Sequence, residues 1–132
     1  MKKKGFTLIE LCSVIAVFGI LFVVFLLQKT NVDAMRRDEE RKTAINAMYY
    51  ALEEGYYKMN GNYPTSISAE NLKMVDPKLF TDPNGILMGE SGCNYIYIPA
   101  NCDTEGKCQA YILRSVLEKE DIYIKRNRLH NV

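Results

Sequence analysis

Residues 2–27 read KKKGFTLIELCSVIAVFGILFVVFLL. Three lysines come first, and residues 6–27 are strongly apolar apart from Thr7, Glu10, Ser13 and Gly19. As an α-helix, this apolar run would be about 33 Å long, against a hydrocarbon core of roughly 30 Å in a lipid bilayer. The run therefore predicts a helix that can span a membrane.

The flanks of the apolar run indicate its orientation. Because basic residues favour the cytoplasmic side of a membrane, Lys2, Lys3 and Lys4 predict a cytoplasmic N-terminus with the rest of the chain outside. An ordinary secretory signal would end in a small-x-small cleavage site, whereas here Gln28, Lys29, Thr30 and Asn31 follow. A plain membrane anchor is the simplest alternative.

Two residues fit a plain anchor poorly. Glu10 lies inside the apolar run, where a charge costs on the order of 2.5–3.5 kcal/mol and usually marks a function. Gly5 is a small residue at the border of the run, where the chain could be cut. A cut after Gly5 would leave a positive α-amine on Phe6, one helical turn from Glu10. Pairing with its own or a neighbour's amine would offset the desolvation of this carboxylate, so Glu10 is expected to set the register of assembly.

The segment KKKGFTLIEL at residues 2–11, followed by an unbroken apolar stretch, resembles the processing signal of type IV pilins and related pseudopilins. The resemblance implies that a prepilin peptidase cleaves after Gly5 and methylates the amine of Phe6. It also implies that Glu10 is the assembly glutamate. An assembly platform and its ATPase would then lift subunits from the cytoplasmic membrane into an extracellular helical filament, a homo-oligomer.

The sequence departs from many pilins in one respect. They carry a proline late in the apolar segment, where it helps the helix to bend or melt, but the first proline here is Pro64. Gly19 is the only helix-weakening residue inside the span, so local melting is expected near it. A close-packing surface formed by Ala16 and Gly19 is an equal alternative.

The helix is expected to continue through residues 28–60 as an amphipathic half and to be ended by the stretch Asn60-Gly61-Asn62-Tyr63-Pro64. Apolar and aromatic residues recur there at three- and four-residue steps and predict one buried stripe: Ile45, Met48, Tyr49, Leu52, Tyr56 and Met59. The charged stretch at residues 36–42 is expected to be a solvated face, with Asp38 and Lys42 paired across one turn. Charge matching between subunits is the alternative.

The remaining residues, 61–132, predict a headpiece. Residues 65–92 are rich in turn signals, with one short helix expected from Ser68 to Met74. Strands are expected at residues 95–98, 109–116 and 121–125, with a hairpin loop at residues 103–106. The predicted fold class is α+β: a small antiparallel sheet that covers the amphipathic helix half. The chain would thus divide into a leader (1–5), a membrane segment (6–27), a second helix half (28–60) and the headpiece.

Four cysteines suggest a disulfide. Cys12 lies in the apolar run and is expected to be a small buried thiol. Cys93, Cys102 and Cys108 lie in the soluble part, and the only histidine is His130, so a disulfide is favoured over a metal site. Cys102 and Cys108 flank the predicted hairpin loop and are the first pairing; Cys93 with Cys108 is the alternative. Neither a metal nor a cofactor is expected.

The charge balance bears on the function classes. The net charge of +1 becomes about −2 without the three N-terminal lysines, which argues against nucleic-acid binding by bulk charge. A pilus-like structural subunit is the leading hypothesis, and a minor pilin or a type II secretion or competence pseudopilin is the nearest alternative. A filament-tip adhesin or DNA-binding subunit has one hint, the basic tail at residues 125–130. Without a Gly-rich phosphate loop or a nucleophile elbow, an enzyme is not expected.

Overall fold

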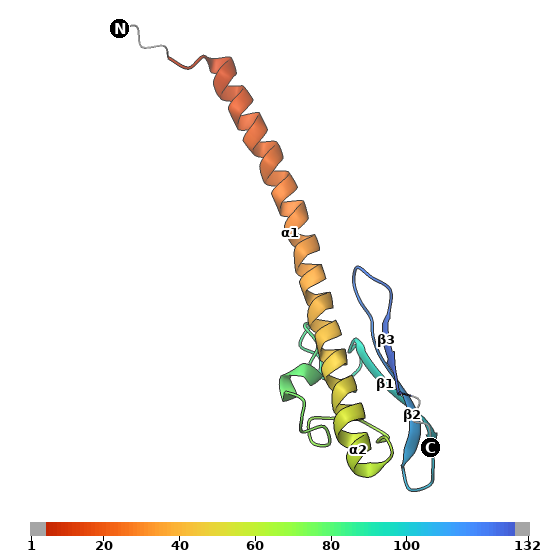
Figure 1. Ribbon diagram of the computed structural model, residues 1–132. Helices are drawn as coiled ribbons and strands as arrows, with labels where there is room; N and C mark the ends of the chain where they lie inside the picture. The colour runs from red at the N-terminus through yellow and green to blue at the C-terminus, as the bar shows by residue number, and fades with distance from the viewer. Residues whose placement is uncertain (1–4, 129–132) are drawn as a thin grey trace. The chain divides into compact units, whose positions relative to one another are not determined.

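The computed structural model describes residues 5–128. A long N-terminal helix and a three-stranded antiparallel sheet confirm the predicted α+β class (Figure 1). The elements are helix α1 (Leu8–Tyr50), the π-helix η1 (Ala51–Tyr56), helix α2 (Tyr57–Asn60), the 3-10 helix η2 (Pro77–Phe80) and the strands β1 (Tyr95–Cys102), β2 (Cys108–Ser115) and β3 (Tyr123–Arg126). Residues 1–4 of the expected leader and residues 129–132 of the C-terminal tail lie outside the described part. The chain forms two compact units, Met1–Ala34 and Met35–Val132, and each is described by itself.

The first unit is an exposed apolar helix. Helix α1 begins at Leu8, two residues later than expected, and is long and apolar enough to cross a membrane by length and composition. Its side chains from Leu8 to Leu27 are exposed in the single chain. Cys12 is exposed as well, so the expectation of a buried thiol is wrong for the single chain, because nothing in this unit covers the helix.

The second unit is organised around the amphipathic part of the helix. Ile45, Met48 and Leu52 are fully buried and form the centre of the core. Met59 is 78% exposed, so its assignment to the stripe is wrong. The expected uninterrupted α-helix is also wrong over six residues, where a π-helical turn shifts the face that the side chains present.

The helix ends where the sequence predicted. Asn60 is its last residue, and Gly61 follows with φ +68°, a left-handed conformation that glycine adopts without a steric penalty. The chain then crosses to the sheet: Tyr63 forms an isolated antiparallel bridge with Cys108 at the start of β2.

The sheet has the strand order β1-β2-β3, and both pairs are antiparallel. The predicted hairpin between the first two strands is confirmed, and its loop is held by Asp103, whose carboxylate accepts the backbone N–H groups of Glu105 and Lys107 at 2.9 Å. One face of the sheet packs on the helix through buried side chains such as Tyr95, Tyr111 and Leu113.

The loop region, residues 65–92, packs on the helix and also adjoins strand β1, since its residues 65–67 and 88–90 line one cavity with residues 95–97. The short helix expected at Ser68 to Met74 is wrong. Only one helical-type bond forms in that described stretch, from the N–H of Leu72 to the carbonyl of Ser68, and the chain then turns through a bond from the N–H of Val75 to the carbonyl of Leu72. The regular turn comes later, as η2, where Asp76 accepts the N–H of Lys78 at 3.0 Å.

The charged stretch of the helix is not simply a solvated face. Asp38 and Arg41 are buried and paired with each other at 2.8 Å. Asp38 therefore does not pair with Lys42, as expected, and Lys42 bonds instead to Glu39 and Glu120. The predicted pair fails because the turn between β2 and β3 docks on this part of the helix and claims both side chains.

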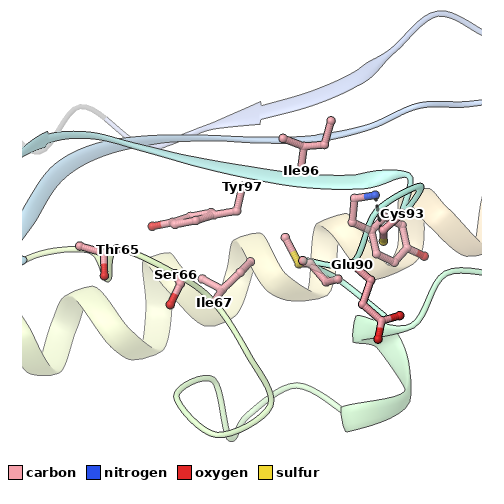
Figure 2. A pocket seen from close by; sticks show the side chains of 10 residues that line it. Thr65, Ser66, Ile67, Glu90, Cys93, Ile96 and Tyr97 are labelled. Atoms are coloured by element: carbon pink, nitrogen blue, oxygen red, sulfur yellow. Dashed lines mark hydrogen bonds between the residues drawn. The ribbon is translucent and has the colours of Figure 1, made fainter. Parts of the chain in front are cut away.

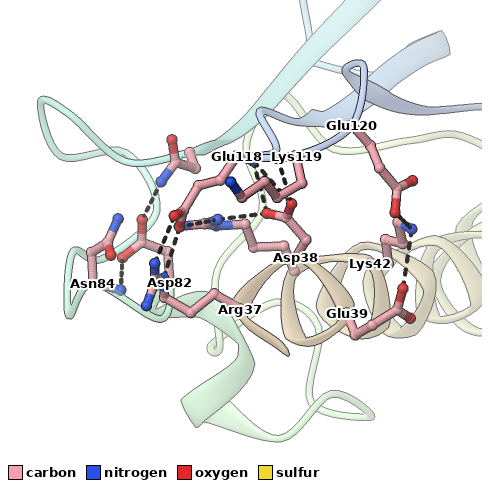
Figure 3. A network of polar contacts seen from close by, with 11 residues as sticks. Arg37, Asp38, Glu39, Lys42, Asp82, Asn84, Glu118, Lys119 and Glu120 are labelled. Atoms are coloured by element: carbon pink, nitrogen blue, oxygen red, sulfur yellow. Dashed lines mark hydrogen bonds and ion pairs between the residues drawn. The ribbon is translucent and has the colours of Figure 1, made fainter. Parts of the chain in front are cut away.

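Figure 3 shows how that turn is held. Asp38 accepts the backbone N–H groups of Glu118 and Lys119, while the Glu118 carboxylate bonds to Arg37 and to Arg41. Bonds from Arg37 and Arg41 lower the pKa of Glu118 to about 2. Burial raises the pKa of Asp38, but the bonds from Glu118, Lys119 and Arg41 outweigh it and leave that pKa lowered.

Candidate processing and assembly site

The start of helix α1 is a capping box. Thr7 is the N-cap residue: its hydroxyl oxygen accepts the backbone N–H of Glu10 at 3.4 Å. In return, a Glu10 carboxylate oxygen accepts the backbone N–H of Thr7 at 3.4 Å. The pair provides an acceptor for the N–H of Thr7 and adds a second acceptor to the N–H of Glu10, which also donates to the Thr7 carbonyl at 3.1 Å. The spacing Thr-x-x-Glu could have revealed the motif from the sequence.

The capping box gives Glu10 a defined place in the first turn. A carboxylate there also interacts favourably with the positive end of the helix dipole. Gly5, Phe6, Thr7 and Glu10 line one shallow hollow at the helix start. The structure therefore brings the residues of the expected cleavage and assembly sites together in a single segment.

The peptide bond between Gly5 and Phe6 is accessible. Both residues are exposed and precede the helix. A Cβ built on Gly5 would meet nothing within 4 Å, so no other described part of this chain covers the position. An extended, uncovered segment of this kind is what a processing enzyme needs in order to bind the chain.

Beyond the capping box, the helix presents apolar side chains in every direction. Ile15, Phe18, Leu21 and Phe22 are each more than half exposed. An uncovered apolar surface this long is unfavourable in water and marks a segment that is covered by lipid or by other chains.

A buried carboxylate in the second unit escaped the sequence analysis. Glu53, in the π-helix η1, is fully buried and accepts hydrogen bonds from the hydroxyl groups of Tyr63 and Tyr111. It also accepts the backbone N–H of Arg128 at 3.2 Å. Burial, followed by the nearby Glu53 charge, raises the pKa values of both tyrosines. No spacing in the sequence predicts this hydrogen-bonded cluster, because Glu53, Tyr63, Tyr111 and Arg128 come from four separate segments.

The basic tail is partly engaged within the chain. Arg128 donates to the Tyr49 hydroxyl group and to the Glu54 carboxylate. The ammonium group of Lys125 lies 5.4 Å from the ring centroid of Tyr49. These contacts leave both cations less available for phosphate groups. Leu129 and His130, which belong to the same expected tail, lie outside the described residues.

The cysteines of the headpiece are divided between a disulfide and a free thiol. Cys102 and Cys108 form the disulfide, which is the first of the two expected pairings. Cys93 is free, so the alternative pairing with Cys108 is not formed.

Cys93 lines an open cavity of about 320 Å³ between β1 and the loop region, together with Ile67 and Tyr97 (Figure 2). Burial raises the pKa of its thiol. Since the thiolate is the reactive form, this thiol is expected to be inert.

Comparison with known proteins identifies the N-terminal segment. Residues 1–26 match the family model of the prokaryotic N-terminal methylation motif. No curated protein and no solved structure matches the chain. The matched segment includes Gly5, Phe6 and Glu10, and it ends inside the exposed apolar part of helix α1. The chain carries the type IV prepilin-like N-terminal signal.

Proposed function

We propose that this chain is a structural subunit of a type IV pilus-like filament. A prepilin peptidase cleaves after Gly5 and methylates the new amine of Phe6. The subunit waits in the cytoplasmic membrane as a single-pass protein with its N-terminus in the cytoplasm. The assembly platform and its ATPase then move it into an extracellular homo-oligomer. The observation that carries the proposal is the methylation motif at residues 1–26, which runs into an exposed apolar helix.

The exposed apolar helix suits both the membrane and the filament. Lipid covers its apolar surface before assembly, and the helices of other copies cover it afterwards. Removal of apolar area from water stabilises the helix by a similar amount per unit area in either setting, so its apolar surface does not oppose transfer from lipid to the filament.

Glu10 gives the helix bundle its register. In the bundle, its carboxylate pairs with the α-amine of Phe6 in a neighbouring copy. An unpaired carboxylate in that apolar setting is costly, so packings in which Glu10 meets no amine are disfavoured. The capping box supports this role, since it holds Glu10 in the first turn beside the processed end.

A minor pilin or a type II secretion or competence pseudopilin would share the same N-terminus. Abundance separates these possibilities, because a major subunit dominates fibres sheared from the cell surface. A tip adhesin or DNA-binding subunit is less supported, since Lys125 and Arg128 are engaged by aromatic and acidic neighbours. The proposed role is structural and requires no enzymatic activity.

The decisive experiment is N-terminal sequencing and mass determination of surface-sheared fibres. The expected product begins with N-methylated Phe6 and lacks residues 1–5. A chain that still begins with its lysines and occurs only in the membrane fraction would contradict the proposal and leave a plain membrane anchor.

A further inference from the structure

The outer face of the three-stranded sheet is apolar and partly uncovered. The strand register places residues 96, 114 and 124 in one row across this face and residues 98, 112 and 126 in the next. Four of these six residues are isoleucines, and Ile98 and Ile124 are 41% and 44% exposed. The opposite face packs on the helix, so within residues 5–128 no second layer covers the isoleucines.

The same face carries two arginines. Arg114 lies opposite Ile124, and Arg126 lies opposite Ile112, so the arginines are diagonal neighbours on adjacent strands. Neither guanidinium has an ion pair among the described side chains. The Nε atom of Arg114 is buried without a hydrogen-bond partner, which is unfavourable. The buried Nε atom of Arg114 would gain from an acceptor that a second chain supplies.

The exposed surface of the loop region has the opposite charge. Among its exposed residues, three acids outnumber two lysines, which gives a net charge of −1, because Asp82 is buried. Glu70 and Glu90 are exposed, and so are Met74 and Leu87. The loop region adjoins the sheet at β1, where Glu90 and Ile96 line one cavity, but its exposed side chains and the outer sheet face are different surfaces of one headpiece.

We propose that the outer sheet face of one copy docks on the loop region of a second copy of this chain. The isoleucines meet the exposed apolar side chains, and Arg114 and Arg126 meet carboxylates. The face does not dock on a copy of itself, because that would bring four like charges together in an apolar setting. The proposal rests on the filament function proposed above.

A contact between two different surfaces has a structural consequence. Because the two surfaces differ, each copy that binds leaves a free surface of each kind for further copies. Such a heterologous contact forms a ring if its rotation closes and an open helical array if it does not. The headpieces thus contribute their own contact to the filament, in addition to the N-terminal helices.

The first test reverses the charges in the full-length chain. Arg114→Glu with Arg126→Glu is expected to reduce the yield of sheared fibres by about tenfold or more. Adding Glu70→Arg and Glu90→Arg in the same chain is expected to restore most of it. Lys107→Glu, an exposed basic residue in the hairpin loop, is the matched control and should leave the yield unchanged. Thermal melting in detergent checks that each variant is folded.

Failure of this inference can be distinguished from failure of the proposed function. Wild-type fibres together with a normal yield from the folded Arg114→Glu, Arg126→Glu chain would overturn this inference and leave the proposed function intact. A wild-type chain that is never found in fibres would overturn the proposed function, and this inference with it.

The second test identifies the occupant by cross-linking. In a chain with Cys12→Ala and Cys93→Ala, Ile124→Cys is combined with Met74→Cys or with Leu87→Cys, and fibres are treated with a short bis-maleimide. At least one combination should give a ladder of multimers, while each single cysteine should give none. Dimers from Ile124→Cys alone would show that the sheet face binds itself. Intact fibres without a ladder in either combination would show a different occupant. Either result would overturn the inference.

Discussion

The hydroxyl group of Tyr111 on β2 donates a hydrogen bond of 2.8 Å to the buried carboxylate of Glu53 in the π-helix. The bond joins two residues that are 58 positions apart in the chain. Tyr63 and the backbone of Arg128 donate to the same carboxylate. A buried carboxylate is tolerated because several donors replace the water it has lost, and those donors connect the helix, the sheet and the C-terminal segment.

Tyr111→Phe is expected to lower the free energy of unfolding by about 1–2 kcal/mol, because it leaves Glu53 buried with one donor fewer. Tyr50→Phe, at an exposed position at the end of helix α1, is the control and should change the free energy of unfolding by less than about 0.5 kcal/mol. Denaturant unfolding of the full chain in detergent, followed by circular dichroism, measures both. Equal stabilities for the two variants would show that the Glu53 bond contributes little.

The docked turn between β2 and β3 predicts a dependence on pH. The pKa values of Asp38 and Glu118 are lowered in the folded chain, that of Glu118 to about 2. The folded state therefore binds fewer protons than the unfolded state, and this stabilisation is present above the ordinary carboxyl pKa near 4.5. It is expected to be lost as the pH falls towards 2.

Thermal melting between pH 5 and pH 2 tests this expectation. The Glu118→Gln chain is the control, since it cannot titrate at this position, and its melting temperature should fall less steeply over the same range. Parallel curves for the two chains would mean that other carboxyl groups dominate acid unfolding.

Removing the disulfide is expected to destabilise the headpiece modestly. The bridge between Cys102 and Cys108 closes a short loop, and constraint of the unfolded chain over such a loop contributes about 2 kcal/mol. The Cys102→Ala, Cys108→Ala chain should lose about that much, while Cys93→Ala serves as the control. Titration of the unreduced, denatured wild-type chain should find two free thiols, Cys12 and Cys93. A count of four would mean that the bridge does not form.

Gly5→Leu is expected to block processing. The peptidase must bind the segment around the cut closely, and a branched side chain in place of a hydrogen atom would obstruct that approach. The variant should accumulate as a precursor that is larger than the mature chain by residues 1–5, visible on a high-resolution gel and by mass. Gly61→Ala, far from the cut, should be processed normally. Mature product from Gly5→Leu would place the cleavage elsewhere.

Glu10→Gln separates the cap from the charge. Glutamine can keep the capping-box bond to the N–H of Thr7, but it cannot form an ion pair with an amine. We expect normal membrane insertion and cleavage, with fibre yield reduced by about tenfold, and a similar loss for Glu10→Ala. Fibre yield is measured by shearing and immunoblotting. Full assembly by Glu10→Gln together with failure of Glu10→Ala would assign Glu10 to capping alone.

Local patterns in the sequence were sufficient to predict the elements that depend on residues close together in the chain. The apolar run predicted the exposed helix, and Gly61 predicted its end, because only a left-handed residue closes the helix there. Alternating strands around residues 103–106 predicted the hairpin. The short helix expected at Ser68 to Met74 does not form: after one helical-type bond the chain turns, and Leu72 and Val75 are buried in the core.

The sequence by itself determined the N-terminal signal, the apolar helix and the α+β class, since these depend on composition and on spacings of a few residues. Only the tertiary structure decided that Asp38 and Arg41 are buried, that Glu53 joins four segments, and that two arginines lie together on an apolar sheet face. The physical reason is distance along the chain. Contacts between residues dozens of positions apart form when the chain folds back on itself, and local sequence patterns do not predict which residues will be in contact.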